Sequence, residues 1–341
     1  MLRTTLLGIL GGLVASASLA AAPQYRIKAV PEAKAMHPRV AQAINQQNVI
    51  AGEGVVEPAD KTVAVFLAGH GSLKALPDTG HLQPTVRDLN KYGVAVGDIN
   101  GEAVVWGTDG VAQNLSELIG CGGVATGVTD AGLVVGSFSC YDQQTNTLRE
   151  ASFSYRNGVL TQIGDFGENT TYINGINNAR QMVGTYGSMR GHTSDAYHAS
   201  IWQHGARTDL GTLGGQRSTG YAINELGHVV GTSDDASHGF FGFLHDGQAM
   251  RPLTSCPGLY AWPLALNRHD QIVGYFQLED TTTRAFLIDQ GLCYEVGDLL
   301  GDSGAGWTDL YALDINDAGV IVGAGRFEGR LRAFVAAPVK P

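Results

Sequence analysis

Residues 221–231 read YAINELGHVVG, and close relatives of this stretch recur along nearly the whole 341-residue chain. It contains an apolar run that ends in Asn224, a short turn with Gly227, and a second aliphatic run that stops at Gly231. Two apolar runs joined by such a turn are typical of a β-hairpin. The stretch therefore predicts an all-β fold built from repeated hairpins.

Seven copies of this hairpin can be aligned, and each copy ends at a glycine. These glycines are Gly52, Gly97, Gly136, Gly184, Gly231, Gly274 and Gly323, and successive ones are 45, 39, 48, 47, 43 and 49 residues apart. Repeats of this length are typical of propeller blades. The sequences of helical repeats would also show apolar residues with a period of about 3.6 residues, which is absent here. A third apolar segment follows each hairpin, and in six copies a tight turn such as Asp246-Gly247 leads to a fourth. Each unit is therefore predicted to be a four-stranded antiparallel sheet.

The seventh copy ends without a fourth segment. Residues 25–30, YRIKAV, precede the first hairpin in the position that fourth segments occupy elsewhere. Pairing of this segment with the last unit would close a ring and remove exposed strand edges. We therefore expect a seven-bladed β-propeller of four-stranded antiparallel blades, closed by the N-terminal strand that completes the last blade. A parallel β-solenoid is the alternative.

The N-terminus indicates export. Residues 1–20 contain Arg3, an apolar run and then small residues, which is typical of a secretory signal peptide. Residues 21–341 are expected to form one propeller domain in the periplasm or outside the cell, as a monomer without a transmembrane segment. The formal net charge of −10 disfavours nucleic acid as a partner.

Several motifs resemble a known family. The stretch AINELGHVVG, the sequence HASIW at residues 198–202 and the sequence RTDLGTLGG at residues 207–215 together resemble the HAF-repeat family of bacterial extracellular proteins. That family has a His-Ala-Phe third strand followed by Asp-Leu-Gly-Thr-Leu-Gly-Gly. The resemblance covers essentially the whole mature chain, although other units replace the His with Glu150, Arg284 or Arg332. It implies an exported repeat protein and transfers no catalytic residue.

Export makes disulfide bonds feasible for the four cysteines. Cys121 and Cys140 are both predicted in loops on one face of the same unit, so we expect them to pair. Cys256 and Cys293 are expected on opposite faces, which leaves their pairing open.

Loop lengths indicate where a ligand would bind. The hairpin turns are tight, whereas the connections predicted on the opposite face are long and varied, and binding sites usually lie on such loops. The longest are residues 53–63, 137–149, 185–197, 232–240 and 275–283. Candidate ligand-binding residues on them are Arg190, His192, Asp195 and His238. The alternative interpretation is that these are solvated loop residues.

The inner strands supply further candidates. Tyr172, Trp262 and Tyr311 begin three inner strands and Trp307 lies close by, so they could stack on sugar rings or pack between blades. Asp88 and Asp314 are the only acidic residues at a position where other inner strands carry Ala or Gly. They could bind Ca²⁺ or act as acid and base, or accept hydrogen bonds from neighbouring backbone.

The leading hypothesis is an exported, non-enzymatic binding propeller that recognises a carbohydrate or protein partner on its loop-rich face. No cofactor is predicted, apart from the Ca²⁺ that the two aspartates could bind. The first alternative is a secreted polysaccharide-degrading hydrolase or lyase using the same face. The second is a structural surface protein.

Overall fold

The computed structural model describes residues 22–33, 36–56, 62–69, 72–76, 83–144, 147–164, 170–188, 196–256, 260–278 and 282–340. The predicted signal peptide lies outside these ranges. Within them, regular structure is almost entirely β-strand, with a short helix α1 (Ser116–Ile119) and two 3-10 turns, η1 (Val296–Leu299) and η2 (Gly301–Gly304). No helix in the described ranges has the length and apolar character needed to cross a membrane.

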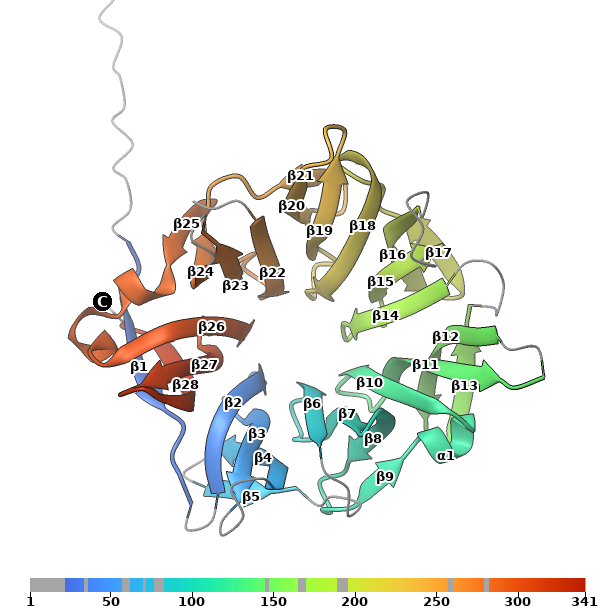
Figure 1. Cartoon of the computed structure of the whole chain (residues 1–341), viewed down its shortest axis with the longest axis horizontal. Coiled ribbons are helices and arrows are strands. Elements are labelled where there is room, and N and C mark those ends of the chain that lie inside the picture. The colour runs from blue at the N-terminus through green and yellow to red at the C-terminus, as the bar shows by residue number, and fades with distance from the viewer. Residues whose placement is uncertain are drawn as a thin grey trace, which may run out of the picture.

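Four-stranded antiparallel sheets are arranged radially, each with its first hairpin strand innermost (Figure 1). The first sheet contains β2 (Met36–Ile44), β3 (Ile50–Val56), β4 (Thr62–Gly69) and β5 (Ser72–Ala75). The second contains β6 (Pro84–Leu89), β7 (Ala95–Ile99), β8 (Glu102–Trp106) and β9 (Ala112–Asn114). The third contains β10 (Gly122–Val128), β11 (Val134–Asp142), β12 (Thr147–Arg156) and β13 (Val159–Ile163).

The next sheet has eight strands because two units share a single parallel pair, Tyr197↔Arg217. One unit contains β14 (Thr170–Ile176), β15 (Met182–Gly187), β16 (Tyr197–Gln203) and β17 (Ala206–Asp209). The other contains β18 (Gly214–Ile223), β19 (Val229–Asp235), β20 (Phe240–His245) and β21 (Met250–Pro252). A further sheet contains β22 (Tyr260–Leu266), β23 (Ile272–Gln277), β24 (Thr283–Asp289) and β25 (Leu292–Glu295).

The last sheet joins the two ends of the chain. It contains β26 (Trp307–Ile315), β27 (Ile321–Phe327), β28 (Arg330–Pro338) and, as its outer strand, β1 (Tyr25–Ala29). β1 pairs antiparallel with β28 from Tyr25↔Pro338 to Ala29↔Phe334. The Ser303 hydroxyl also accepts a 3.1 Å hydrogen bond from the Ile27 amide. The predicted pairing of residues 25–30 with the last unit is therefore observed.

The glycine that ends each hairpin has a steric reason. In the β18–β19 pair the register shifts between Gly220 and Ala222, so Tyr221 is the extra residue of a β-bulge. A Cβ atom at Gly231 would overlap the Thr219 carbonyl oxygen and lie 2.9 Å from the Phe243 ring. The other six terminal glycines meet the equivalent carbonyl oxygen, and each inner strand carries the same register shift. The bulge is thus a property of the repeat.

The core lies between neighbouring sheets. Phenylalanines on third strands are fully buried and in five sheets pair with the terminal glycine, whose missing side chain leaves room for the ring. They are Phe66, Phe153, Phe243, Phe286 and Phe334. This packing joins each sheet to its neighbours.

An asparagine series links the units at the end of the inner strands. The Nδ2 group of each asparagine donates to the backbone carbonyl of its counterpart in the next unit, at 2.9–3.1 Å. The donors are Asn45, Asn90, Asn177, Asn224, Asn267 and Asn316, and Asn316 donates to Asn45. Thr129 occupies this position in the third unit. The asparagine series therefore also links the last unit to the first.

Two of the predicted long loops are largely strand. β11 and β12 remain paired to Asp142↔Thr147, so most of residues 137–149 is a two-stranded ribbon. β19 reaches Asp235, whose carboxylate accepts hydrogen bonds from the Ser237 and Gly239 amides and thereby closes a short turn. Strand pairing satisfies backbone groups that a loop of that length would leave to water.

Candidate functional site

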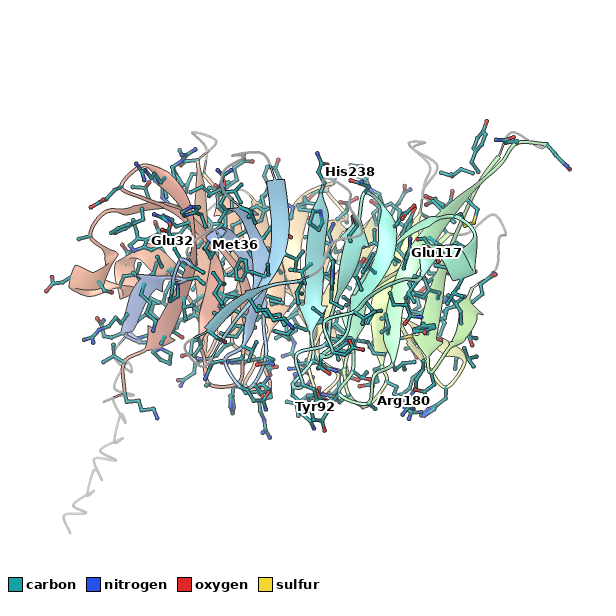
Figure 2. The ribbon with its side chains drawn as sticks, turned by 90° about the horizontal axis from the view of Figure 1, so that it is seen from below. Glu32, Met36, Tyr92, Glu117, Arg180 and His238 are labelled. Carbon is teal, nitrogen blue, oxygen red and sulfur yellow. A yellow bond between two sulfur atoms is a disulfide. The ribbon has the colours of Figure 1, made fainter. Side chains whose placement is uncertain are left out.

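The molecule has two opposite faces. Turns between first and second strands lie on one face, here named the turn face, where Figure 2 shows Tyr92 and Arg180. Turns between second and third strands and connections between units lie on the other, here named the connection face, which carries His238. This is the face on which the sequence predicted a binding site.

A cavity of about 620 Å³, here named the upper cavity, opens toward the connection face. Five bulged residues of successive inner strands line it, because the bulge redirects one side chain per unit toward the centre. They are Arg87, Thr126, Asn174, Tyr221 and Leu264. Tyr172, a residue predicted from the sequence, also lines this cavity. The five bulged residues were missed, although each directly precedes the small or acidic position that the sequence singled out.

Polar side chains around the upper cavity are held by contacts with their own unit or with the next unit. The Thr126 hydroxyl donates to the Ile173 carbonyl at 2.8 Å, and the Asn174 amide donates to the Gly220 carbonyl at 2.8 Å. The hydroxyls of Tyr221 and Thr232 are 2.9 Å apart. These contacts orient the side chains before any ligand arrives, which lowers the entropy cost of binding.

The Tyr172 hydroxyl donates to the Glu150 carboxylate. Burial raises the pKa of this phenol, and the carboxylate raises it further. Tyr172 is therefore neutral at physiological pH and presents its ring to the cavity.

Arg87 is the one charged residue lining the upper cavity within the described part of the chain. Its Nη2 atom lies 3.7 Å from Oδ1 of Asp98, and its side chain is half exposed. Glu53 lies close enough for the Arg87 charge to affect it and accepts a 3.1 Å hydrogen bond from the Val86 amide. Burial raises the pKa of both the Glu53 and the Asp98 carboxyl groups, and Arg87 partly opposes this rise. Arg87, Glu53 and Asp98 thus form a cluster of one cation and two carboxyl groups whose pKa values are raised.

Two other predicted aromatic residues, Trp262 and Tyr311, belong to a continuous aromatic series across three units. Trp262 stacks on Tyr275 at 5.2 Å between ring centroids, and Tyr275 meets Tyr311 edge-on at 5.7 Å. Phe240 lies 5.8 Å from Trp262. Tyr311 accepts a 2.7 Å hydrogen bond from the Thr283 hydroxyl. Both Trp262 and Tyr311 are half-buried, so each packs against a neighbour while keeping part of its surface exposed.

Two further predicted residues, Trp307 and His238, do not line the upper cavity. Trp307 packs against Phe327 and Phe334 beside the core of the last sheet. His238 is exposed in the β19–β20 turn, with φ at +65°. Three further candidates lie outside the described residues: Arg190, His192 and Asp195.

Asp88 and Asp314 line a second cavity of about 370 Å³, here named the lower cavity, which opens at the turn face. The Asp314 carboxylate accepts hydrogen bonds from the Ile44 and Ile315 amides, both at 2.8 Å. Asp88 accepts from Val128 and Leu89 in the same way. Each aspartate therefore bridges to the backbone of the next unit, which is one of the roles that the sequence left open.

Burial raises the pKa of Asp314 to about 7, and repulsion from Asp88 adds to this rise. Burial also raises the pKa of Asp88. Among the described residues, no group of three or more His, Cys, Asp or Glu side chains is placed to hold a metal ion.

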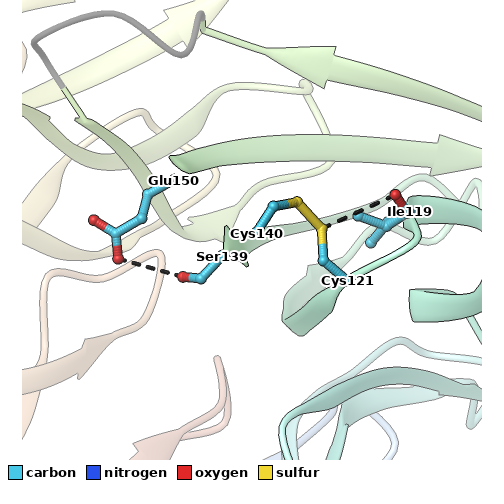
Figure 3. The surroundings of a disulfide bond; sticks show 5 residues. All are labelled: Ile119, Cys121, Ser139, Cys140 and Glu150. Carbon is cyan, nitrogen blue, oxygen red and sulfur yellow. Dashed lines mark hydrogen bonds between the residues drawn. A yellow bond between two sulfur atoms is a disulfide. The ribbon is translucent and has the colours of Figure 1, made fainter. Parts of the chain in front are cut away.

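Both disulfide bonds form. Cys121 pairs with Cys140, as predicted, with Cα atoms 5.2 Å apart (Figure 3). Cys140 lies in β11 and not in a loop, one residue beyond the Gly122↔Ser139 pair. Cys256 pairs with Cys293, with Cα atoms 5.0 Å apart, so the expectation that they lie on opposite faces is wrong. The segment that leaves β21 passes beside the outer strand β25 of the next sheet, which brings the two cysteines together.

The histidine of the HASIW stretch has a partner within its own sheet. His198 Nδ1 lies 3.0 Å from both carboxylate oxygens of Asp209, on the adjacent strand. Two units further on, Arg284 occupies the same position and its Nε atom lies 3.2 Å from Glu295. This position therefore joins third and fourth strands through charge, with the identity of the charged groups varying between units.

The radial four-stranded sheets define the protein as a β-propeller. It is similar to the β-propeller domain of the trilobed protease from Pyrococcus furiosus, with 8% identity, a TM-score of 0.55, and coverage of 89% of this chain and 96% of that one. An acylaminoacyl peptidase from Pyrococcus horikoshii matches with 9% identity, a TM-score of 0.52, and coverage of 85% of this chain and 49% of that one. No family model and no curated protein matches the sequence. At such identities the likeness concerns the fold alone.

Proposed function

We propose that this protein is an exported, non-enzymatic binding propeller that recognises a carbohydrate at the upper cavity. The observation that carries the proposal is the convergence of Tyr172 and Tyr221 with Asn174 and Thr126 in one cavity. Aromatic faces stack on sugar rings, and amide and hydroxyl groups form hydrogen bonds with sugar hydroxyls. A protein partner at the same face is the competing ligand.

We further propose that the propeller has seven blades in a closed ring. The β1–β28 pairing supports closure, as do two contacts from the last unit to the first, Asn316 to Asn45 and Asp314 to Ile44. The two disulfide bonds support an exported location. The resemblance to the HAF-repeat family supports the same location.

Glycan-array screening followed by titration calorimetry tests the carbohydrate proposal. Tyr172→Ala should weaken binding of the best glycan at least about tenfold, because it removes a stacking surface from the cavity. Tyr92→Ala is the matched control, since Tyr92 is 64% exposed on the turn face. Equal glycan affinity in the two variants would show that the site lies elsewhere. If no glycan binds and only a protein partner is captured, the ligand is that protein and not a carbohydrate.

A polysaccharide-degrading hydrolase or lyase is the second candidate. The Glu53 and Asp98 carboxyl groups favour it, since acids with raised pKa beside a cavity are suited to proton transfer. Incubation with polysaccharide pools should then release reducing ends or unsaturated products, and Glu53→Gln and Asp98→Asn should abolish the release. An absence of products from the wild-type protein would contradict this activity.

A further inference from the structure

A third cavity lies on the connection face between the first and last sheets. It has a volume of about 510 Å³ and is here named the seam pocket. Its lining residues are Glu32, His37, Arg39, Val55, Arg330, Leu331 and Arg332. They come from β2, β3, β28 and the segment that follows β1, so only the pairing of the chain ends brings them together.

The seam pocket is positively charged in an acidic protein. Three arginines and one glutamate give its lining a formal charge of +2 with His37 neutral, against −10 for the whole chain. The lower cavity is the opposite, with five carboxyl groups and two basic groups in its lining. A pocket of this sign attracts anions even though the protein as a whole repels them.

Two of the three guanidinium groups are available to a ligand. Glu32 forms an ion pair with Arg332 and lies 3.2 Å from His37 Nδ1, so its charge is engaged. Arg39 and Arg330 are exposed, and within the described part of the chain neither side chain has a hydrogen-bond or ion-pair partner. Arginine presents a planar set of donors that matches the oxygens of carboxylate and sulfate groups.

We propose that the seam pocket binds the anionic group of an acidic sugar, a carboxylate or sulfate ester, through Arg39 and Arg330. This inference rests on the carbohydrate ligand of the proposed function and specifies its chemical class. The exposed Leu331 supplies apolar surface beside the charges, and the buried Val55 also lines the pocket, which suits a sugar ring that carries an acid group. Nucleic acid is the disfavoured anion because the rest of the surface is acidic.

Titration calorimetry with a matched ligand pair tests the proposal. An oligogalacturonate carries one carboxylate per sugar, whereas its methyl-esterified form has the same rings without the charge. The free acid should bind the wild-type protein at least about tenfold more tightly than the ester, and added salt should reduce this difference. A sulfated oligosaccharide of equal length shows which anionic group is preferred.

The double variant Arg39→Gln/Arg330→Gln should lose the preference for the free acid and retain its affinity for the ester. Arg251→Gln is the matched control, since Arg251 is 70% exposed on β21, away from this pocket. Unchanged melting temperatures would show that the variants remain folded. Equal binding of acid and ester by the wild-type protein, or tighter binding of an oligonucleotide of equal charge, would overturn the proposal.

The two proposals fail in different ways. Loss of glycan binding in Tyr172→Ala without any acid preference would keep the upper cavity and overturn the seam pocket. An acid preference that disappears only in the double variant, while Tyr172→Ala binds normally, would keep the seam pocket and overturn the upper cavity. Failure of every glycan to bind would overturn both.

Discussion

The turn face and the connection face use the same hairpins in different ways. At the turn face, asparagine side chains bond to the backbone of the next unit, and Asp88 and Asp314 add two further bridges. At the connection face, the bulged positions carry Arg87, Thr126, Asn174, Tyr221 and Leu264, which differ in size, charge and hydrogen-bonding capacity. A repeated contact links neighbouring units, whereas variation at one position per unit gives the upper cavity its chemistry. Substitutions at the two faces should therefore separate stability from binding.

Every inner strand carries the bulge, so a substitution that disrupts it should have the largest effect on stability. Gly231→Ala should lower the free energy of unfolding by more than about 3 kcal/mol, because the new Cβ overlaps the Thr219 carbonyl and crowds Phe243. Urea unfolding followed by far-UV circular dichroism measures this change. Gly247→Ala is the control: its Cβ would meet nothing within 4 Å, and its φ of +83° should cost only about 1 kcal/mol.

The asparagine contact across the chain ends should come next. Asn316→Ala removes hydrogen bonds from its Nδ2 group to the Asn45 carbonyl at 3.1 Å and to Asn48 Oδ1 at 2.8 Å. It should destabilise the protein by about 2 kcal/mol, since it also removes the Oδ1 atom that accepts hydrogen bonds from the Ala318 and Val320 amides. Ligand affinity should change by less than about twofold. Leu226→Ser, at a 59% exposed position of the same face, should change stability by less than about 0.5 kcal/mol. A large affinity loss in Asn316→Ala would show that the two faces are coupled.

The stability of the turn face should depend on pH through Asp314. Its folded-state pKa of about 7 lies above the ordinary value of 3.8, so the folded protein binds this proton more tightly than the unfolded chain does. The contribution is complete below about pH 4 and is lost as the pH rises through 7, with a slope of up to about 1.4 kcal/mol per pH unit. Urea unfolding from pH 4.5 to 8 should show a fall in wild-type stability that Asp314→Asn reduces. Parallel pH profiles for the two proteins would contradict this assignment.

The gap in the asparagine series offers the smallest test. In other units the asparagine at this position donates to the backbone carbonyl of its counterpart in the next unit. The Thr129 side chain does not donate to the Asn177 carbonyl, and its hydroxyl instead accepts a hydrogen bond from the Leu133 amide at 3.0 Å. Thr129→Asn should complete the series and stabilise the protein by about 0.5–1 kcal/mol. Thr129→Ser is the control, because it keeps the hydroxyl and adds no donor of asparagine length. A destabilised Thr129→Asn variant would show that the third unit does not accept the common contact.

Local sequence patterns were sufficient for the strand order. Four-stranded antiparallel sheets were predicted from apolar runs, turn residues such as Gly227 and a repeat of similar length. The same patterns predicted the pairing of residues 25–30 with the last unit and the Cys121–Cys140 bond. Tyr172 was also placed correctly near the start of an inner strand. These features depend on contacts within one unit or on the count of units, which a repeat displays directly.

Other features depend on contacts between units. The Cys256–Cys293 bond follows from the path of a connection beside the next sheet, and the Asp314–Ile44 contact joins residues 270 positions apart. The direction of a bulged side chain such as Tyr221 depends on how two strands pair, and its place in a cavity depends on the neighbouring units. The sequence by itself therefore determined the repeating sheet, because short-range periodicity encodes it. Only the tertiary structure decided which side chains meet at the upper cavity and the seam pocket, because their positions are set by the packing of whole sheets around the centre.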